Sequence, residues 1–346
     1  MATSSGITML LLSSGYPFGG KRGGFGGGRL SPNDRALSRR QPCPVVAPVR
    51  RARPLTRCHS SASIGPMVAD SGVVLGIDVG WSSVHKTTGV CVLSWTLTEV
   101  FVNPLRLQAG EDAGLKGPIG DRPILALAIE GPIRGGLDEI GIYRLAEQML
   151  TRGFARYIGK PGQSSSGNGR KLNAGANRMA QSVLALNKLV MAEHRARIHE
   201  RAVVEAFPTS FLGVMLDARR APPHGPRSDV YFQHLLGPSA NIVAPPATDR
   251  LVGLLGRLLP GRQLARGSFA QIEDHEERAA LVCALTALSV AARQYVAVGD
   301  DNGYIILPPR AEAGEPGLQP WAWEILERNR PANSKDAIIV ERSPAR

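Results

Sequence analysis

The stretch VVLGIDVGWSS, from Val73 to Ser83, sets the expectations for the rest of the chain. It opens with a short apolar run of the kind found in a strand that is buried on both faces. One carboxylate, Asp78, stands within the stretch, between Gly76 and Gly80. A buried charge is costly unless something pairs with it, and neighbouring glycines let a backbone or a ligand come close.

Three interpretations of Asp78 follow from this stretch alone. The carboxylate can cap the end of the strand and bond the amides of a turn. It can be the first acid of a metal cluster, because a metal ion would offset the cost of burying the charge. It can also be the acid of a phosphate-binding loop. The residues near Asp78 leave all three open.

Composition places most of the positive charge outside the part of the chain that is expected to fold. The 346 residues carry a net charge of +12, and residues 1–66 hold ten Lys and Arg against one acid. The remainder is only mildly basic, which permits nucleic-acid binding without arguing for it. A hydrophobic content of 43% is sufficient for a substantial core.

Residues 1–66 are expected to lie outside the fold. Gly, Ser, Pro and Arg dominate them, and no helix or strand period is present. Three explanations compete: a true start at Met67, an organellar transit peptide, or a disordered basic arm. We expect a cytoplasmic protein, or an organellar one if this leader is genuine.

The cysteines and the hydropathy pattern indicate neither a disulfide framework nor a membrane protein. Cys43, Cys58, Cys91 and Cys283 show no metal-ligand spacing. Cys91 and Cys283 stand in apolar segments and are expected to be small buried side chains in a reducing compartment. No apolar run approaches the roughly 18 residues that a membrane span needs.

The pattern after Met67 predicts an α/β domain over 67–310, followed by a Pro-rich tail with a short helix over 311–346. Strands are expected at 73–78, 87–95, 98–103, 124–130, around 203–207, and in a hairpin over 295–307. Helices are expected at 138–151, 176–200, from Asp274 onward and at 321–330, with a Gly/Ser-rich loop over 159–175.

Acids gather where these elements end or begin. Glu130 closes an apolar strand, and Asp274, Glu276 and Glu277 open the late helix. Acids placed in this way can converge with Asp78 at one edge of a sheet and hold Mg²⁺ or Mn²⁺ through carboxylate oxygens. For the helix acids, capping and the helix dipole are an alternative explanation.

Several other polar residues are candidates for supporting roles. Glu205 could be structural or a further ligand, and Lys86 and Arg134 could face the site or contact phosphates. Arg144 and Glu147 could reach over the site or form an ion pair at i, i+3 spacing. The basic run from His194 to Arg201 suggests an exposed helix face or, less directly, a nucleic-acid groove.

Four segments carry a resemblance. GIDVGW, AIEGPIRGG, VVEAFPTSF and ALVCALTA, in this order between Val73 and Ala297, resemble a domain-of-unknown-function family of predicted nucleases in the RNase H-like superfamily. The resemblance implies a mixed sheet, with antiparallel strands first and parallel strands after, flanked by helices. It implies Asp78 and Glu130 as metal ligands, with a late-helix acid as the third. Where the family often carries Asp in that helix, this chain has Ala279.

The resemblance implies a metal-dependent nuclease that hydrolyses phosphodiester bonds of DNA or RNA by a two-metal mechanism. The first alternative is a catalytically inactive RNase H-like domain used for binding or scaffolding, for which Ala279 is the main support. The second is a phosphotransferase of the actin and sugar-kinase type, because G-I-D-x-G also opens its phosphate-binding hairpin.

Overall fold

Three antiparallel strands begin the folded chain. The computed structural model describes residues 69–80, 85–108, 112–154, 161–217, 228–236, 249–265, 268–312 and 315–342. Strands β1 (Gly72–Asp78), β2 (Thr88–Trp95) and β3 (Glu99–Leu107) pair in sequence order. The predicted consecutive antiparallel strands are therefore confirmed, with the third strand longer than expected. The 1–66 leader and Met67 lie outside the described residues.

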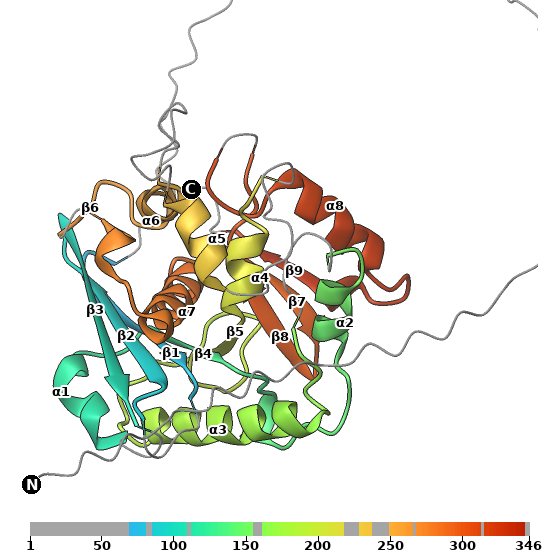
Figure 1. Cartoon of the computed structure of the whole chain (residues 1–346), viewed down its shortest axis with the longest axis horizontal. Coiled ribbons are helices and arrows are strands. Elements are labelled where there is room, and N and C mark those ends of the chain that lie inside the picture. The colour runs from blue at the N-terminus through green and yellow to red at the C-terminus, as the bar shows by residue number, and fades with distance from the viewer. Residues whose placement is uncertain are drawn as a thin grey trace, which may run out of the picture. The chain divides into compact units, whose positions relative to one another are not determined.

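The remaining strands extend this unit into one mixed sheet. Strand β4 (Ala126–Glu130) pairs parallel to β1, β5 (Val203–Ala206) pairs parallel to β4, and β8 (Gly303–Leu307) pairs parallel to β5. Strands β7 (Tyr295–Asp300), β9 (Ile338–Glu341) and β6 (Gln263–Leu264) complete it. Within the described residues the order is β6-β3-β2-β1-β4-β5-β8-β7-β9 (Figure 1).

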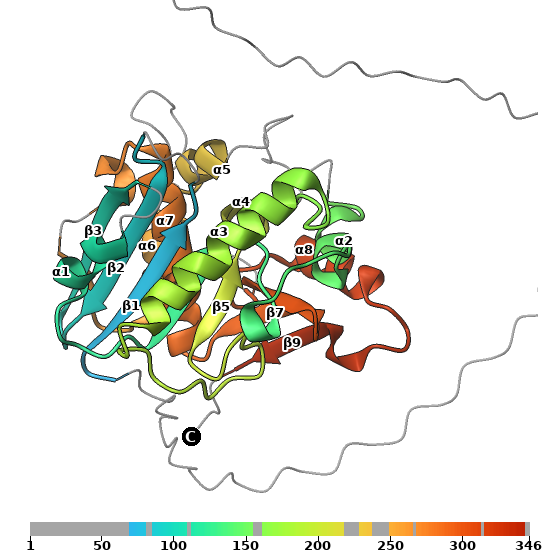
Figure 2. The same cartoon turned by 90° about the horizontal axis from the view of Figure 1, so that it is seen from below.

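Two long helices cover opposite faces of the central strands. Helix α7 (His275–Ala291) shares a core with Val74, Ala126 and Ala128. Helix α3 (Gly167–Leu184) packs on the alternate residues of the same strands, which form a second core, and Figure 2 shows it crossing that face. Because side chains alternate along a strand, the register of each strand decides which residues meet α7 and which meet α3.

Two glycines let α7 come unusually close to the sheet. A Cβ atom built on Gly76 would lie 2.1 Å from the backbone nitrogen of Ala284, and one on Gly89 would lie 2.0 Å from the carbonyl oxygen of Glu276. Any side chain at these positions would push the helix away. The first turn of α7 therefore lies directly over β2, beside the end of β1.

The other helices and turns complete the layers around the sheet. Their bounds are α1 (Lys116–Ile119), α2 (Leu145–Thr151), α4 (Pro208–Gly213), α5 (Ser228–Leu235), α6 (Arg250–Leu258) and α8 (Pro320–Asn329), with 3₁₀ turns η1 (Asp112–Leu115), η2 (Gly135–Leu137), η3 (Phe269–Gln271) and η4 (Lys335–Ala337). None of the helices in the described ranges has the length and apolar character needed to span a bilayer.

Two predicted boundaries on either side of the Gly/Ser-rich segment are wrong. The helix expected from Asp138 begins only at Leu145, because the Asp138 carbonyl accepts hydrogen bonds from two side chains of α3 instead of closing a helical turn. The loop expected to reach Gly175 ends at Ser166, whose side chain accepts a hydrogen bond from the Gly169 amide and caps α3. A good cap here outweighs the low helix propensity of glycine.

The helix expected over 176–200 ends at Leu184, and the basic run 194–201 is not a helix face. Asn187 adopts a left-handed conformation (φ 54°), which stops the helix. Beyond it, Ala192, His194, Ala196 and Ile198 are buried while the residues between them are exposed. This alternation has the period of an extended chain, and the sequence MAEHRARI already contained it.

The segment predicted as a tail over 311–346 contributes a strand to the sheet. It holds the expected helix α8, and it also contributes β9, which pairs with β7 from Tyr295↔Glu341 to Val298↔Ile338. The apolar residues of IIVE meet an available strand edge only in the folded chain, which is why composition alone suggested a tail.

Candidate active site

Asp78 and Glu130 occupy adjacent positions at the ends of two neighbouring parallel strands. They are register partners in the pairing of β1 with β4. The same row continues through Gly89 on β2 to Arg106 on β3. Register partners point to the same face of a sheet, and this face is the one that α7 covers, as the contact of Gly89 with α7 shows. The two carboxylates thus meet on one side of the sheet.

The pKa values of the two acids are linked, and burial raises both. Burial raises the pKa of Asp78 well above its usual value, and the neighbouring Glu130 raises it further. Burial also raises the pKa of Glu130, while a hydrogen bond with Asp78 lowers it in part. Both residues keep some solvent-exposed surface. We expect the pair to share a proton when no cation is bound, since two close carboxylates rarely both ionise.

The acids at the start of α7 lie beside this row but are paired with another residue. Asp274 caps the helix by accepting a hydrogen bond from the Glu277 amide at 3.1 Å. It also binds Arg106 (Nη1 to Oδ2, 2.9 Å), and Glu276 lies 3.6 Å from the same guanidinium. Glu276 still raises the pKa of Asp78, while His275 lowers it. The capping explanation therefore holds for Asp274. Glu276 is the helix acid that changes the pKa of Asp78.

The expected cluster of three acids is not assembled. Among the residues that the structure describes, no three His, Cys, Asp or Glu side chains are grouped so that they could hold a metal ion. Glu277, the remaining predicted acid, has its pKa raised by burial and then by Asp274. The structure brings Asp78 and Glu130 together, but it does not group a helix acid with them as a third ligand.

Arg106 is the residue that sequence reasoning missed. It lies on β3, donates to the carbonyl oxygen of Lys86 and pairs with the acids of α7. In the sequence it was only a basic residue in VNPLRL, beyond the end of the strand expected at 98–103. What makes it relevant is the row that it shares with Asp78, and a row across four strands is visible only once the register is known.

The predicted supporting residues lie elsewhere. Glu205 belongs to the row of Ile129 and points to the face that α3 covers, where it binds Arg144. Its role as a further ligand of the pair is therefore wrong. The side chain of Lys86 is exposed, and Arg134 is partly buried with its Nε lacking a hydrogen-bond partner among the described residues. Neither is shown in contact with the pair.

His194, at the start of the basic run, is a buried neutral group. It stands edge-on to Tyr295, and burial, followed by Arg197 and Arg293, lowers its pKa from 6.5 to about 4. The unfolded chain therefore takes up the proton first as pH falls, so that the stability present above pH 6.5 is lost toward pH 4. The basic run does not present this residue to a nucleic acid.

We expect the wild-type protein to lose about 3 kcal/mol more unfolding free energy between pH 7 and pH 4 than the His194→Gln variant does. Denaturant unfolding of both proteins across this range measures the difference, and comparison with the variant removes the contribution of all other titrating groups. Parallel stability curves for the two proteins would contradict the burial of a neutral imidazole at this position.

A scan against protein-family models, a search of curated proteins and a search of solved structures found no match to this chain.

Proposed function

We propose that this chain is a metal-dependent nuclease with an RNase H-like fold, which hydrolyses phosphodiester bonds of nucleic acids. The order β3-β2-β1-β4-β5, antiparallel first and parallel after, agrees with the fold that the four sequence segments imply. The observation that carries the proposal is the pair of partly buried carboxylates, Asp78 and Glu130, adjacent on one face at the ends of two strands.

The donor set fits Mg²⁺ or Mn²⁺. Both prefer oxygen ligands, and Mg²⁺ in particular is commonly held by one or two carboxylates, with water and substrate phosphate completing its shell. Two hydrogen-bonded acids whose pKa values are raised by burial lose a shared proton in exchange for such a cation. Asp78 and Glu130 would hold the cation, which when bound would activate water and stabilise the leaving oxygen.

In this proposal, the residues in and around the pair have three roles. Asp78 and Glu130 bind and orient the cation. Glu276 adds negative charge near Asp78, which raises the pKa of that carboxyl and would also attract a divalent cation. Arg106, at the other end of the row, holds Glu276 and Asp274 and so fixes the first turn of α7 against β2.

Binding without cleavage is the second candidate function. It is favoured by Ala279 in α7, where the resemblance implies an acid, and by the ion pairs that Arg106 makes with two of the helix acids. Such a domain would retain the fold and could contact nucleic acid without turning it over.

The test is cleavage of labelled single-stranded, duplex and branched DNA and RNA by the full-length protein in Mg²⁺ or Mn²⁺, with a chelator as control. We expect cleavage by the wild type, loss of cleavage in Glu130→Gln, and retention in Glu99→Gln, an exposed acid on β3 of the same sheet. Binding without turnover would favour the second candidate, and ATP-dependent label transfer would favour a phosphotransferase.

A further inference from the structure

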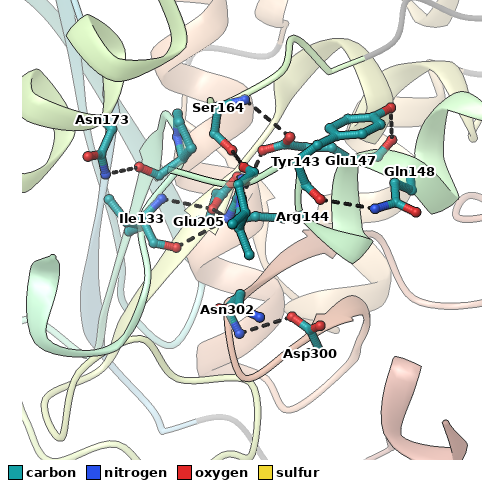
Figure 3. A network of polar contacts seen from close by, with 12 residues as sticks. Ile133, Tyr143, Arg144, Glu147, Gln148, Ser164, Asn173, Glu205, Asp300 and Asn302 are labelled. Atoms are coloured by element: carbon teal, nitrogen blue, oxygen red, sulfur yellow. Dashed lines mark hydrogen bonds and ion pairs between the residues drawn. The ribbon is translucent and has the colours of Figure 1, made fainter. Parts of the chain in front are cut away.

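The chain that leaves Glu130 is held in place from the α3 face of the sheet. The Ile133 amide donates to Oε2 of Glu205 at 3.0 Å, and the Ile133 carbonyl accepts from Nη1 of Arg144 at 3.3 Å. One residue earlier, the Pro132 carbonyl accepts from Nδ2 of Asn173 on α3 at 2.8 Å. Figure 3 shows these contacts converging on the segment after β4. Three consecutive polar groups of this backbone are thus bound to side chains.

The groups that hold this segment form a buried ionic cluster. Arg144 binds both oxygens of Glu205 at 2.7 Å and donates through Nε to Glu147 at 2.8 Å. Glu147 also accepts from the Ser164 amide at 3.1 Å. The exposed fractions of Arg144, Glu147 and Glu205 are 1%, 1% and 3%. The cluster joins β5, α2 and the start of the segment that leads into α3.

Stability alone gives little reason for such a cluster. Buried ion pairs of this kind recover little more than their desolvation cost, and apolar residues of similar volume often stabilise a protein as well. What a bidentate pair provides is direction, since the planar guanidinium fixes the positions of the groups around it. Here the fixed groups include the amide and the carbonyl of Ile133.

The fixed backbone is close to the proposed ligand in both sequence and space. Two residues separate Glu130 from Ile133, and Glu205 is the register partner of Ile129, the residue before Glu130. Glu130 points to the α7 face, and the cluster lies under the α3 face. A change in the path of residues 131–133 would therefore rotate the end of β4 and move the Glu130 carboxylate relative to Asp78.

We infer that Arg144, Glu205 and Asn173 are positioning residues, which hold Glu130 beside Asp78 in the geometry that a divalent cation requires. This inference rests on the proposed function, since it concerns the same site. It assigns to Glu205 and Arg144 an effect on cation binding from the opposite face of the sheet, without contact with the cation.

The chain offers a matched pair of variants on α3. Asn173 and Asn177 are one helical turn apart, are both buried, and both reach the Asp138 carbonyl, at 3.5 and 3.4 Å. The structure shows only Asn173 donating to Pro132 as well. Asn173→Ala therefore removes the hydrogen bond to the Pro132 carbonyl in the segment after Glu130. Asn177→Ala removes a comparable side chain but leaves that hydrogen bond in place.

Calorimetric titration of the full-length protein with Mn²⁺, well below the melting temperature of each variant, is the decisive measurement. We expect Asn173→Ala to raise the Kd for Mn²⁺ by about tenfold, as loss of a group that orients a metal ligand does, and Asn177→Ala to leave it within about twofold. Amide hydrogen exchange at Glu130–Arg134 is expected to accelerate in Asn173→Ala alone, a change that general destabilisation would spread over the sheet.

A second pair of variants tests the ionic cluster. Glu205→Gln and Glu147→Gln each remove one charge bound to Arg144, but only Glu205 also holds Ile133. We expect the Kd for Mn²⁺ to rise more in Glu205→Gln than in Glu147→Gln, even where both lower the melting temperature equally. If one pair of variants fails to fold, the other pair still gives the result.

The outcomes separate the two claims. A wild-type protein that binds no Mn²⁺ would overturn the proposed function and this inference with it. Wild-type binding with equal affinity in Asn173→Ala and Asn177→Ala, or in both glutamine variants, would overturn the positioning role and leave the proposed metal site standing. Unchanged amide exchange at Ile133 in Asn173→Ala would show that the segment is held by other means, and would also overturn it.

Discussion

Asp78→Asn is expected to abolish cation-dependent cleavage while leaving the protein at least as stable as the wild type. The variant keeps a side chain of the same size that can still hydrogen-bond to Glu130, and it removes one of two charges that burial makes unfavourable. Mutation of a residue that hydrogen-bonds to a metal ligand commonly lowers metal affinity or activity by about 10–100-fold. We therefore expect loss of the ligand itself to lower the cleavage rate by more than about a hundredfold.

The stability effect has a defined dependence on pH. The raised pKa values of the pair mean that the folded wild type retains a proton that the unfolded chain gives up, so the wild type loses stability as pH rises above 4. We expect Asp78→Asn to gain about 1 kcal/mol at pH 7, as when a functional site group is removed, and to gain nothing near pH 4.

Cleavage assays and denaturant unfolding at both pH values measure the two effects on the same preparation. Wild-type cleavage by Asp78→Asn would show that the pair is not the reacting site. A variant that is less stable at pH 7 would show that the Asp78 carboxylate is a structural cap, the first of the interpretations that the sequence left open.

Ala279→Asp is expected to complete the site. Ala279 is buried in α7, three residues after Glu276, which acts on the charge of Asp78. It is four residues before Cys283, whose pKa is raised by burial and then by Glu130 and Asp78. Positions at i+3 and i−4 share one helix face, so a carboxylate at this position would lie next to the pair and offer a third ligand to the proposed cation.

The expected result is a rise in Mn²⁺ affinity of about tenfold or more, since affinity for such cations increases with the number of charged ligands. Without the cation, a third buried acid should lower the unfolding free energy by about 2 kcal/mol. Ala279→Asn is the control, because it adds the same volume without the charge. Equal Mn²⁺ affinity in the two variants would show that position 279 does not face the pair.

The pair itself could be predicted from the sequence because its signals are local. Asp78 and Glu130 each stand at the end of an apolar run, and each run forms the strand that its composition indicates. Parallel neighbours then bring their ends together at one edge of the sheet. The signal for the N-cap at Asp274 was also local, since an Asp just before a helical pattern commonly marks the start of a helix.

The polar partners could not be predicted, because each depends on residues far away in the chain. Arg106 and Asp274 are 168 residues apart, and Arg144 and Glu205 are 61 apart. Arg144 and Glu147 could equally have formed a surface pair at i, i+3 spacing, and only the packing of α2 on β7 and β8 buries them. Glu205 looked like a possible ligand because sequence does not show which face of its strand it occupies.

The sequence by itself determined that this chain builds a mixed α/β unit with two strand-end acids and a late helix of small residues. Strand and helix periods, glycines and caps act over a few neighbouring positions, and these suffice to establish such elements. The tertiary structure decided that Asp78 and Glu130 share one face of the sheet and that Arg106 forms ion pairs with the helix acids. It also decided that Glu205 lies on the opposite face, where it binds Arg144. Register and helix packing set these relations, because a shift of one residue in a strand exchanges its two faces.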